Sequence, residues 1–139
     1  MIVYLDTSAL VKLYVQERGS SEVTRLVERA STVTTARLAH PEAAAAFARL
    51  EREGTITISV ADRIGADLER DFDHLLVVEL SPSVSHRAAA LSRTHALRGS
   101  DAVHLASAVE IERASGRRPT FCCFDDHLTA AATAEGLPT

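Results

Sequence analysis

MIVYLDTSALVKL, residues 1–13, is the stretch that decides the fold. Residues 2–5 form a short apolar, partly β-branched run, which predicts a buried strand. The run ends in an acid, and Asp6-Thr7-Ser8 begins a helical pattern that we expect to continue to about Gln16. The chain therefore opens with a strand that passes directly into a helix, with a carboxylate at the junction.

The same alternation of short apolar runs and helical patterns continues along the rest of the chain. Three further strands are predicted at residues 32–35, 75–80 and 120–124. Helical patterns separate them, and one helix is expected to open at residues 59–62 (SVAD), which resemble a capping box with Asp in place of Glu. Strands joined by helical crossovers imply a parallel sheet. We therefore predict an α/β fold, a single domain over residues 1–139 with a parallel sheet of four to five strands and helices on both faces.

Length, composition and charge exclude several classes of protein. The chain has 139 residues and a net charge of −4, and no apolar run approaches the roughly 18 residues that a membrane span needs. The N-terminus lacks the basic region of a signal peptide, so a cytoplasmic location is expected. Cys122 and Cys123 are adjacent and cannot form a disulfide framework, so we expect them to pack in the core. The net acidity argues against a protein that coats DNA through a basic patch, but it allows nucleic acid held through a metal ion.

Four acidic residues stand where apolar elements begin or end. Asp6 and Asp125 follow the first and fourth predicted strands, and Glu42 and Asp101 stand at the starts of predicted helices. Taken singly, each has an ordinary explanation, because carboxylates cap helices and are favoured in their first turn. Open parallel sheets, however, place their sites beyond the carboxyl ends of the strands. The four acids are therefore candidates for one common site.

Convergence of these carboxylates would have a chemical consequence. Carboxylates in one cleft repel one another and raise one another's pKa values. Such a set is stable in its ionised form when a cation is bound, and oxygen ligands favour a hard cation, Mg²⁺ or Mn²⁺. A few carboxylates, several waters and a substrate phosphate around Mg²⁺ are the arrangement of metal-assisted phosphodiester hydrolysis. The acidic set predicts that chemistry.

Motifs along essentially the whole chain form an ordered set. They are Asp6-Thr7-Ser8 after the leading strand, a helical Glu in mid-chain, SDAVHLA at residues 100–106, and FDDHL at residues 124–128. In order and spacing these motifs resemble those of PIN-domain ribonucleases, and the chain length is similar to that of the VapC toxins of bacterial toxin–antitoxin pairs. No single motif is specific, whereas the ordered set is. The resemblance implies a PIN-like three-layer fold.

The resemblance also implies the residues of the site, position by position. The metal ligands would be Asp6, Asp101 and Asp125, with Asp126 as the substitute for Asp125. Glu42 would bind or orient metal-bound water. Thr7 or Ser8 would orient the substrate. The catalytic set is therefore expected to be Asp6, Glu42, Asp101 and Asp125.

The activity implied by the resemblance is that of a Mg²⁺-dependent endoribonuclease. A metal-activated water would hydrolyse an RNA phosphodiester bond and leave a 5′-phosphate and a 3′-hydroxyl. Mn²⁺ is expected to substitute for Mg²⁺. The implied partners are the RNA substrate, an inhibitory VapB-like antitoxin and a second copy of the chain in a homodimer. Neither membrane association nor direct DNA binding by this chain alone is expected.

Other classes of protein remain as alternatives. A receiver-type signalling domain would need a lysine after a late strand, but the only lysine, Lys12, is near the start of the chain. A haloacid-dehalogenase-type phosphatase would need a second Asp two residues after the first, where this chain has Ser8. A catalytically silent PIN-like domain that binds RNA or protein is the runner-up, and the intact acidic set argues against it. His104, one helical turn after Asp101, is interpreted as a histidine packed in a buried helix.

Overall fold

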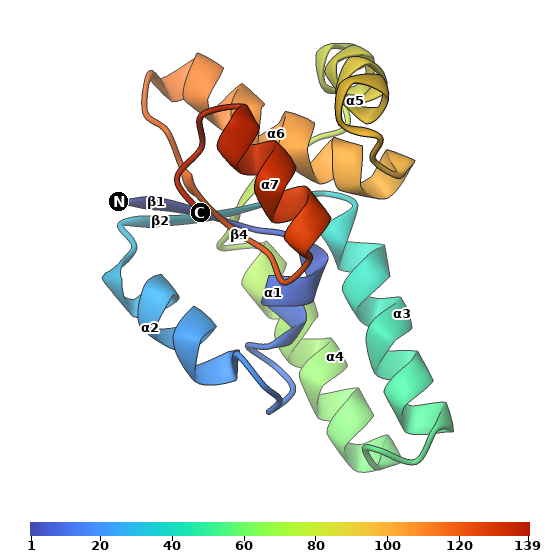
Figure 1. Cartoon of the computed structure of the whole chain (residues 1–139). Coiled ribbons are helices and arrows are strands. Elements are labelled where there is room, and N and C mark those ends of the chain that lie inside the picture. The colour runs from blue at the N-terminus through green and yellow to red at the C-terminus, as the bar shows by residue number, and fades with distance from the viewer.

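Four parallel strands form the centre of the computed structural model, which describes residues 1–139 (Figure 1). They are β1 (Ile2–Leu5), β2 (Thr32–Ala36), β3 (Leu76–Val78) and β4 (Thr120–Cys122), in the order β3-β2-β1-β4. The helices are α1 (Thr7–Val11), α2 (Ser20–Arg29), α3 (Ala39–Arg52), α4 (Ile58–Phe72), α5 (Pro82–His95), α6 (Gly99–Ser115) and α7 (Asp126–Ala134). None of these helices is long and apolar enough to cross a membrane.

Helices cover both faces of the sheet and bury two separate cores. Figure 1 shows α5, α6 and α7 on one side of the strands and α1 to α4 on the other. Successive side chains of a strand point to opposite faces, and β1 accordingly contributes Tyr4 to one core and Val3 and Leu5 to the other. All three side chains are fully buried. The predicted three-layer α/β fold is confirmed, with four strands.

Cys122 and Cys123 also divide between the two faces of the sheet. Cys122 packs against the core that contains Val3, and Cys123 packs against the core that contains Tyr4. Both thiols are free and only partly buried. The two cysteines therefore contact the cores from their margins rather than forming the interior.

Four predicted boundaries were wrong in detail, and one of them is that β3 spans Leu76–Val78 rather than residues 75–80. α1 ends at Val11 rather than near Gln16, because the Lys12 and Leu13 N–H groups bond to carbonyls only three residues back, which tightens and ends the helix. α4 begins at Ile58, where Thr57 rather than Ser59 is the cap and accepts a hydrogen bond from the Val60 N–H. β4 ends at Cys122, so Asp125 lies in the loop beyond the strand and not at its end.

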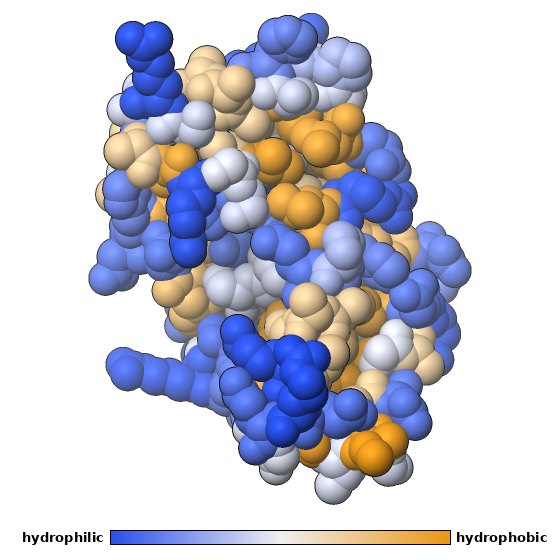
Figure 2. Space-filling model, turned by 90° about the vertical axis from the view of Figure 1, so that its right-hand side faces the viewer, coloured by the Kyte–Doolittle hydropathy of each residue, from blue (hydrophilic) through white to orange (hydrophobic).

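Exposed apolar side chains are scattered over the surface. The large ones are Met1, Ile58, Leu76, Leu80 and Phe124. Figure 2, which shows the right-hand side of the view in Figure 1, has apolar residues in separate patches among hydrophilic ones. The apolar residues of the chain are therefore used mainly within the two cores.

Gly19 holds the turn between α1 and α2 against the loop that leads into α7. Its φ of 93° lies in the left-handed region, and a Cβ there would stand 2.6 Å from Cε1 of Phe124. Gly54 has a similar φ of 73° but nothing within 4 Å of an added Cβ.

We expect Gly54→Ala to cost about 1–2 kcal/mol of backbone strain, and Gly19→Ala to cost more because the Phe124 ring must also move. Denaturant unfolding of the two variants measures the difference, and equal losses would show that the ring contact adds nothing.

Candidate active site

Asp6 lies at the junction between β1 and α1 and is buried, with 5% of its surface exposed. Its backbone is extended and its side chain caps α1, a position for which Asp is well suited. The Oδ1 atom accepts hydrogen bonds from the Ala9 N–H at 2.9 Å and from the Ser8 hydroxyl at 2.7 Å. No hydrogen bond reaches Oδ2. One carboxylate oxygen is therefore fixed, and the other is free for a ligand.

The pKa of Asp6 is raised above its usual value. Burial is the largest cause, and the charge of the Asp101 carboxylate adds to it, while the hydrogen bonds from Ser8 and Ala9 offset part of the rise. Asp101 belongs to the first turn of α6, and its Oδ2 lies 3.5 Å from Nε of Arg98, a side chain that is 82% exposed. The structure therefore brings Asp6 and Asp101 close enough for their charges to interact.

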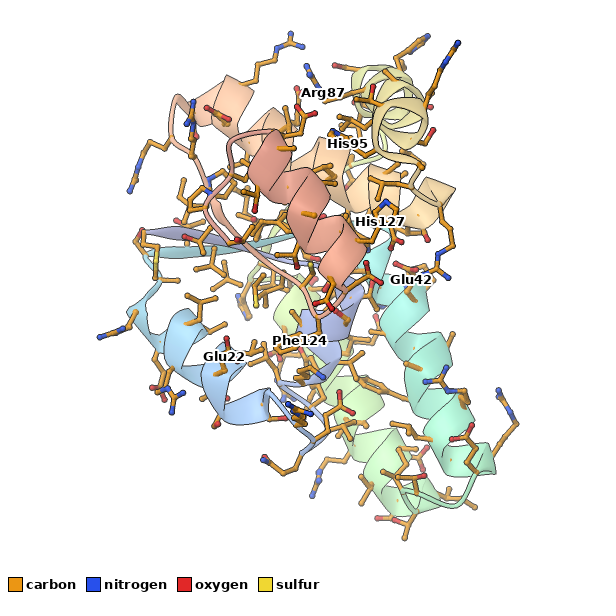
Figure 3. All side chains as sticks on the ribbon, in the orientation of Figure 1. Glu22, Glu42, Arg87, His95, Phe124 and His127 are labelled. Carbon is orange, nitrogen blue, oxygen red and sulfur yellow. The ribbon has the colours of Figure 1, made fainter.

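Glu42 enters the same region from the first turn of α3 (Figure 3). The Thr7 hydroxyl donates to its Oε1 at 2.7 Å, and Nε2 of His104 lies 2.9 Å from the same oxygen. Burial raises the pKa of Glu42, but the hydrogen bonds from His104 and Thr7 outweigh it, so the net shift is downward. Glu42 is therefore ionised at neutral pH, and its Oε2 accepts no hydrogen bond from the protein.

His104 is buried, as expected from its apolar neighbours, but it is also part of the site. Its Nδ1 lies 2.9 Å from the hydroxyl of Tyr4, and its Nε2 lies 3.0 Å from Oγ1 of Thr7 as well as close to Glu42. These contacts were not predicted. Two signals in the sequence point to them. His104 follows Asp101 by one helical turn, and Tyr4 precedes Asp6 by two positions, where the extended backbone of Asp6 continues the alternation of β1.

Asp125 is held near Asp6 by a short chain of contacts. Its Oδ1 caps α7 by accepting the Leu128 N–H at 2.8 Å. Ser8, which donates to Asp6, accepts the backbone N–H of Phe124 at 3.1 Å, and Figure 3 shows Phe124 in the loop before α7. Burial raises the pKa of Cys123, and the charges of Asp6 and Asp125 both add to the rise. Asp126 is exposed in the first turn of α7 and forms no side-chain hydrogen bond.

The donor set fits a hard cation held by few protein ligands. No group of three or more Asp, Glu, His or Cys side chains lies where it could hold a metal ion. A buried carboxylate with one unbonded oxygen, next to a second carboxylate, is nevertheless a site that a cation would stabilise. Mg²⁺ keeps several waters and commonly takes one or two carboxylates together with substrate phosphate. The residues present therefore fit Mg²⁺ or Mn²⁺ better than a closed zinc or calcium site.

A parallel α/β sheet with acidic residues gathered beyond the ends of β1 and β4 defines the protein as a PIN-type domain. A family model described as PIN domain matches residues 3–132, so the chain belongs to the PIN domain family. The resemblance inferred from the motifs is thereby confirmed.

Named relatives agree with this assignment. The chain is 43% identical over 114 residues to Ribonuclease VapC45 of Mycobacterium tuberculosis (strain CDC 1551 / Oshkosh), over 79% of this chain and 76% of the relative. Among solved structures, M. tuberculosis VapC20, described as a sarcin-ricin loop cleaving toxin, superposes with a TM-score of 0.66 at 20% identity, over 94% of this chain and 95% of that one. A toxin–antitoxin complex from Klebsiella pneumoniae superposes with a TM-score of 0.62 at 15% identity, over 88% and 86% of the two chains. At such identities the two solved structures support the fold.

Proposed function

We propose that the protein is a Mg²⁺-dependent endoribonuclease, a VapC-like toxin that hydrolyses RNA phosphodiester bonds. The observation that carries the proposal is the buried Asp6 carboxylate, which has one unbonded oxygen and lies under the influence of the Asp101 charge. Ionising both groups is costly unless a cation is bound. The name of the curated relative, a ribonuclease, supports RNA as the substrate.

In this proposal Asp6, Asp101 and Asp125 would hold the cation together with waters and the substrate phosphate, with Asp126 as the neighbour that could replace Asp125. When bound, Mg²⁺ supplies positive charge to the scissile phosphate and makes a water more acidic. The Mn²⁺ ion is expected to serve in its place.

The remaining steps belong to side chains of the protein. Glu42 is ionised, has a free Oε2, and orients the attacking water by accepting its hydrogen bond. The Thr7 hydroxyl donates a hydrogen bond to Glu42 and the Ser8 hydroxyl donates one to Asp6, and these bonds hold the two carboxylates in place. The water oxygen forms a bond to phosphorus and gives up one proton to solvent. The bond from phosphorus to the 3′ oxygen breaks, and a proton from solvent reaches the leaving oxygen. The products are a 5′-phosphate and a 3′-hydroxyl.

The partners and location follow from the same assignment. We propose that a VapB-like antitoxin inhibits the protein, since a fold neighbour is a toxin–antitoxin complex. We further propose that the 139 residues form a single domain, that the chain forms a homodimer, and that it acts in the cytoplasm.

Purified protein is expected to cleave RNA when Mg²⁺ or Mn²⁺ is present and to lose all cleavage in EDTA. The measurement is a gel assay with end-labelled RNA, in which a cleaved product with a 3′-hydroxyl can be extended by a polymerase. Asp6→Ala and Asp101→Ala proteins, purified in parallel, are the controls. Equal cleavage by these variants would show that a contaminating nuclease causes the activity. RNA binding without cleavage in any divalent ion would favour the alternative, a catalytically silent PIN-like domain.

A further inference from the structure

We propose that His104 is a positioning residue which holds Glu42 and Thr7 in their working orientation, and that Tyr4 holds the ring of His104 in place through its other nitrogen. This inference rests on the proposed function, because it assigns a role within the same site. The residues come from β1, α1, α3 and α6, and two of the contacts join positions 100 and 62 residues apart in the chain. Neither Tyr4 nor His104 belongs to the acidic set.

The tautomer follows from the groups around the ring. Tyr4 is fully buried, and a phenol hydroxyl carries its proton at neutral pH. That hydroxyl lies 2.9 Å from Nδ1, and in this proposal it donates to Nδ1. A neutral imidazole that accepts at one nitrogen carries its proton on the other. His104 therefore presents an N–H group at Nε2.

The Nε2–H group meets two oxygens. Glu42 Oε1 is 2.9 Å away and Thr7 Oγ1 is 3.0 Å away. Because the Thr7 hydroxyl uses its only proton to bond Glu42 Oε1 at 2.7 Å, Oγ1 can only accept from His104. Both neighbours of Nε2 are thus acceptors, and they require the same Nε2–H tautomer that donation from Tyr4 to Nδ1 favours.

The result is a carboxylate held through one oxygen. Two donors, Thr7 and His104, converge on Oε1 of Glu42, while Oε2 stays free for the attacking water. A Glu side chain without such contacts samples several rotamers. The ring of His104 cannot swing away, because it is 2% exposed and its second nitrogen is bonded to Tyr4, whose own ring stacks on Phe121 at a centroid distance of 5.3 Å.

Two substitutions at His104 separate positioning from packing. In His104→Gln the amide nitrogen stands where Nε2 stood and can still donate to Glu42, whereas in His104→Asn the amide reaches only to the place of Nδ1. We expect His104→Asn to lower kcat by about 10- to 100-fold, the usual cost of losing a partner that orients a site, with KM within about 2-fold. His104→Gln should recover most of that loss. Equal kcat values for two folded variants of equal Tm would overturn the inference.

A second measurement does not depend on activity. Nitrogen-15 NMR of the His104 ring in metal-free protein reports which nitrogen carries the proton. In the wild type we expect a protonated Nε2 and an unprotonated Nδ1. In Tyr4→Phe, which retains the stacking on Phe121, Nε2 should stay protonated because it still faces two acceptors, while the Nδ1 signal should shift because that nitrogen loses its donor. A wild-type ring protonated at Nδ1 alone overturns the inference, even if the protein cleaves RNA. Absence of cleavage by wild-type protein would contradict the proposed function, and the NMR result would still decide the role of Tyr4.

Discussion

Asp6→Asn is expected to reduce RNA cleavage by on the order of 10³-fold or more and at the same time to raise the thermal stability of the metal-free protein. The loss of activity follows because a metal ligand is removed, and metal ions supply several kcal/mol of charge stabilisation in such reactions. The gain in stability follows because Asn keeps the shape of the helix cap and can accept from Ser8 and Ala9 without the buried charge.

The pH dependence of the gain is fixed by the direction of the pKa shift. The pKa of Asp6 is raised from 3.8, first by burial. Ionising Asp6 in the folded protein therefore costs free energy that is absent below the unfolded pKa and appears as the pH rises through the folded pKa. Asn never carries this cost. The Tm of Asp6→Asn should equal that of the wild type in acid and exceed it by a few degrees at neutral pH.

Differential scanning fluorimetry in EDTA between acid and neutral pH measures the difference in Tm between Asp6→Asn and the wild type, and a gel assay measures RNA cleavage. Asp62→Asn, at an exposed position on α4, is the matched control and should change neither quantity. A Tm for Asp6→Asn that falls at neutral pH would show that the Asp6 charge stabilises the metal-free fold. Mg²⁺ should reverse the order of stability, because only the wild type binds it tightly.

Local signals predicted the fold well and its boundaries less well. β1 and Asp6 were read from four apolar residues and the acid that follows, because burial of a short strand leaves a strong local pattern. The capping box assigned to residues 59–62 was wrong, since Thr57, two positions earlier, offers an equally good hydroxyl and its extended backbone decides the start of α4. Caps of similar chemistry in adjacent positions cannot be separated by sequence pattern alone.

The acids of the site could be predicted, but the bonds among them could not. Acids at strand and helix ends are visible in one sequence, and the sheet rule gathers them at one edge. The bond between Tyr4 and His104 joins residues 100 positions apart and depends on how α6 packs against β1. A histidine among apolar neighbours has the same local pattern whether it is inert or bonded at both nitrogens.

Glu42→Gln is expected to lower kcat by about 10²-fold, the lower end of what a group that handles water and protons contributes. In the metal-free protein it should also lower stability at neutral pH, the opposite of Asp6→Asn. Burial alone would raise the pKa of Glu42, but its bonds with His104 and Thr7 lower it below 4.5.

The sign of this second effect follows from that lowered pKa. The carboxylate contributes stability that is present above the unfolded pKa and is lost as the pH falls through the folded pKa. Gln still accepts from both donors but without the charge, so the loss of unfolding free energy should be about 1 kcal/mol at neutral pH and absent at acid pH.

Urea unfolding in EDTA at both pH values measures this loss. Glu51→Gln on the same helix is the control, because Glu51 forms no ion pair. If Glu42→Gln and Asp6→Asn changed stability in the same direction at neutral pH, the opposite roles assigned to the two carboxylates would be wrong. If both variants lost activity but neither changed stability, both acids would still belong to the site. The burial of Asp6 and the hydrogen bonds of Glu42 would then have no opposite effects on stability.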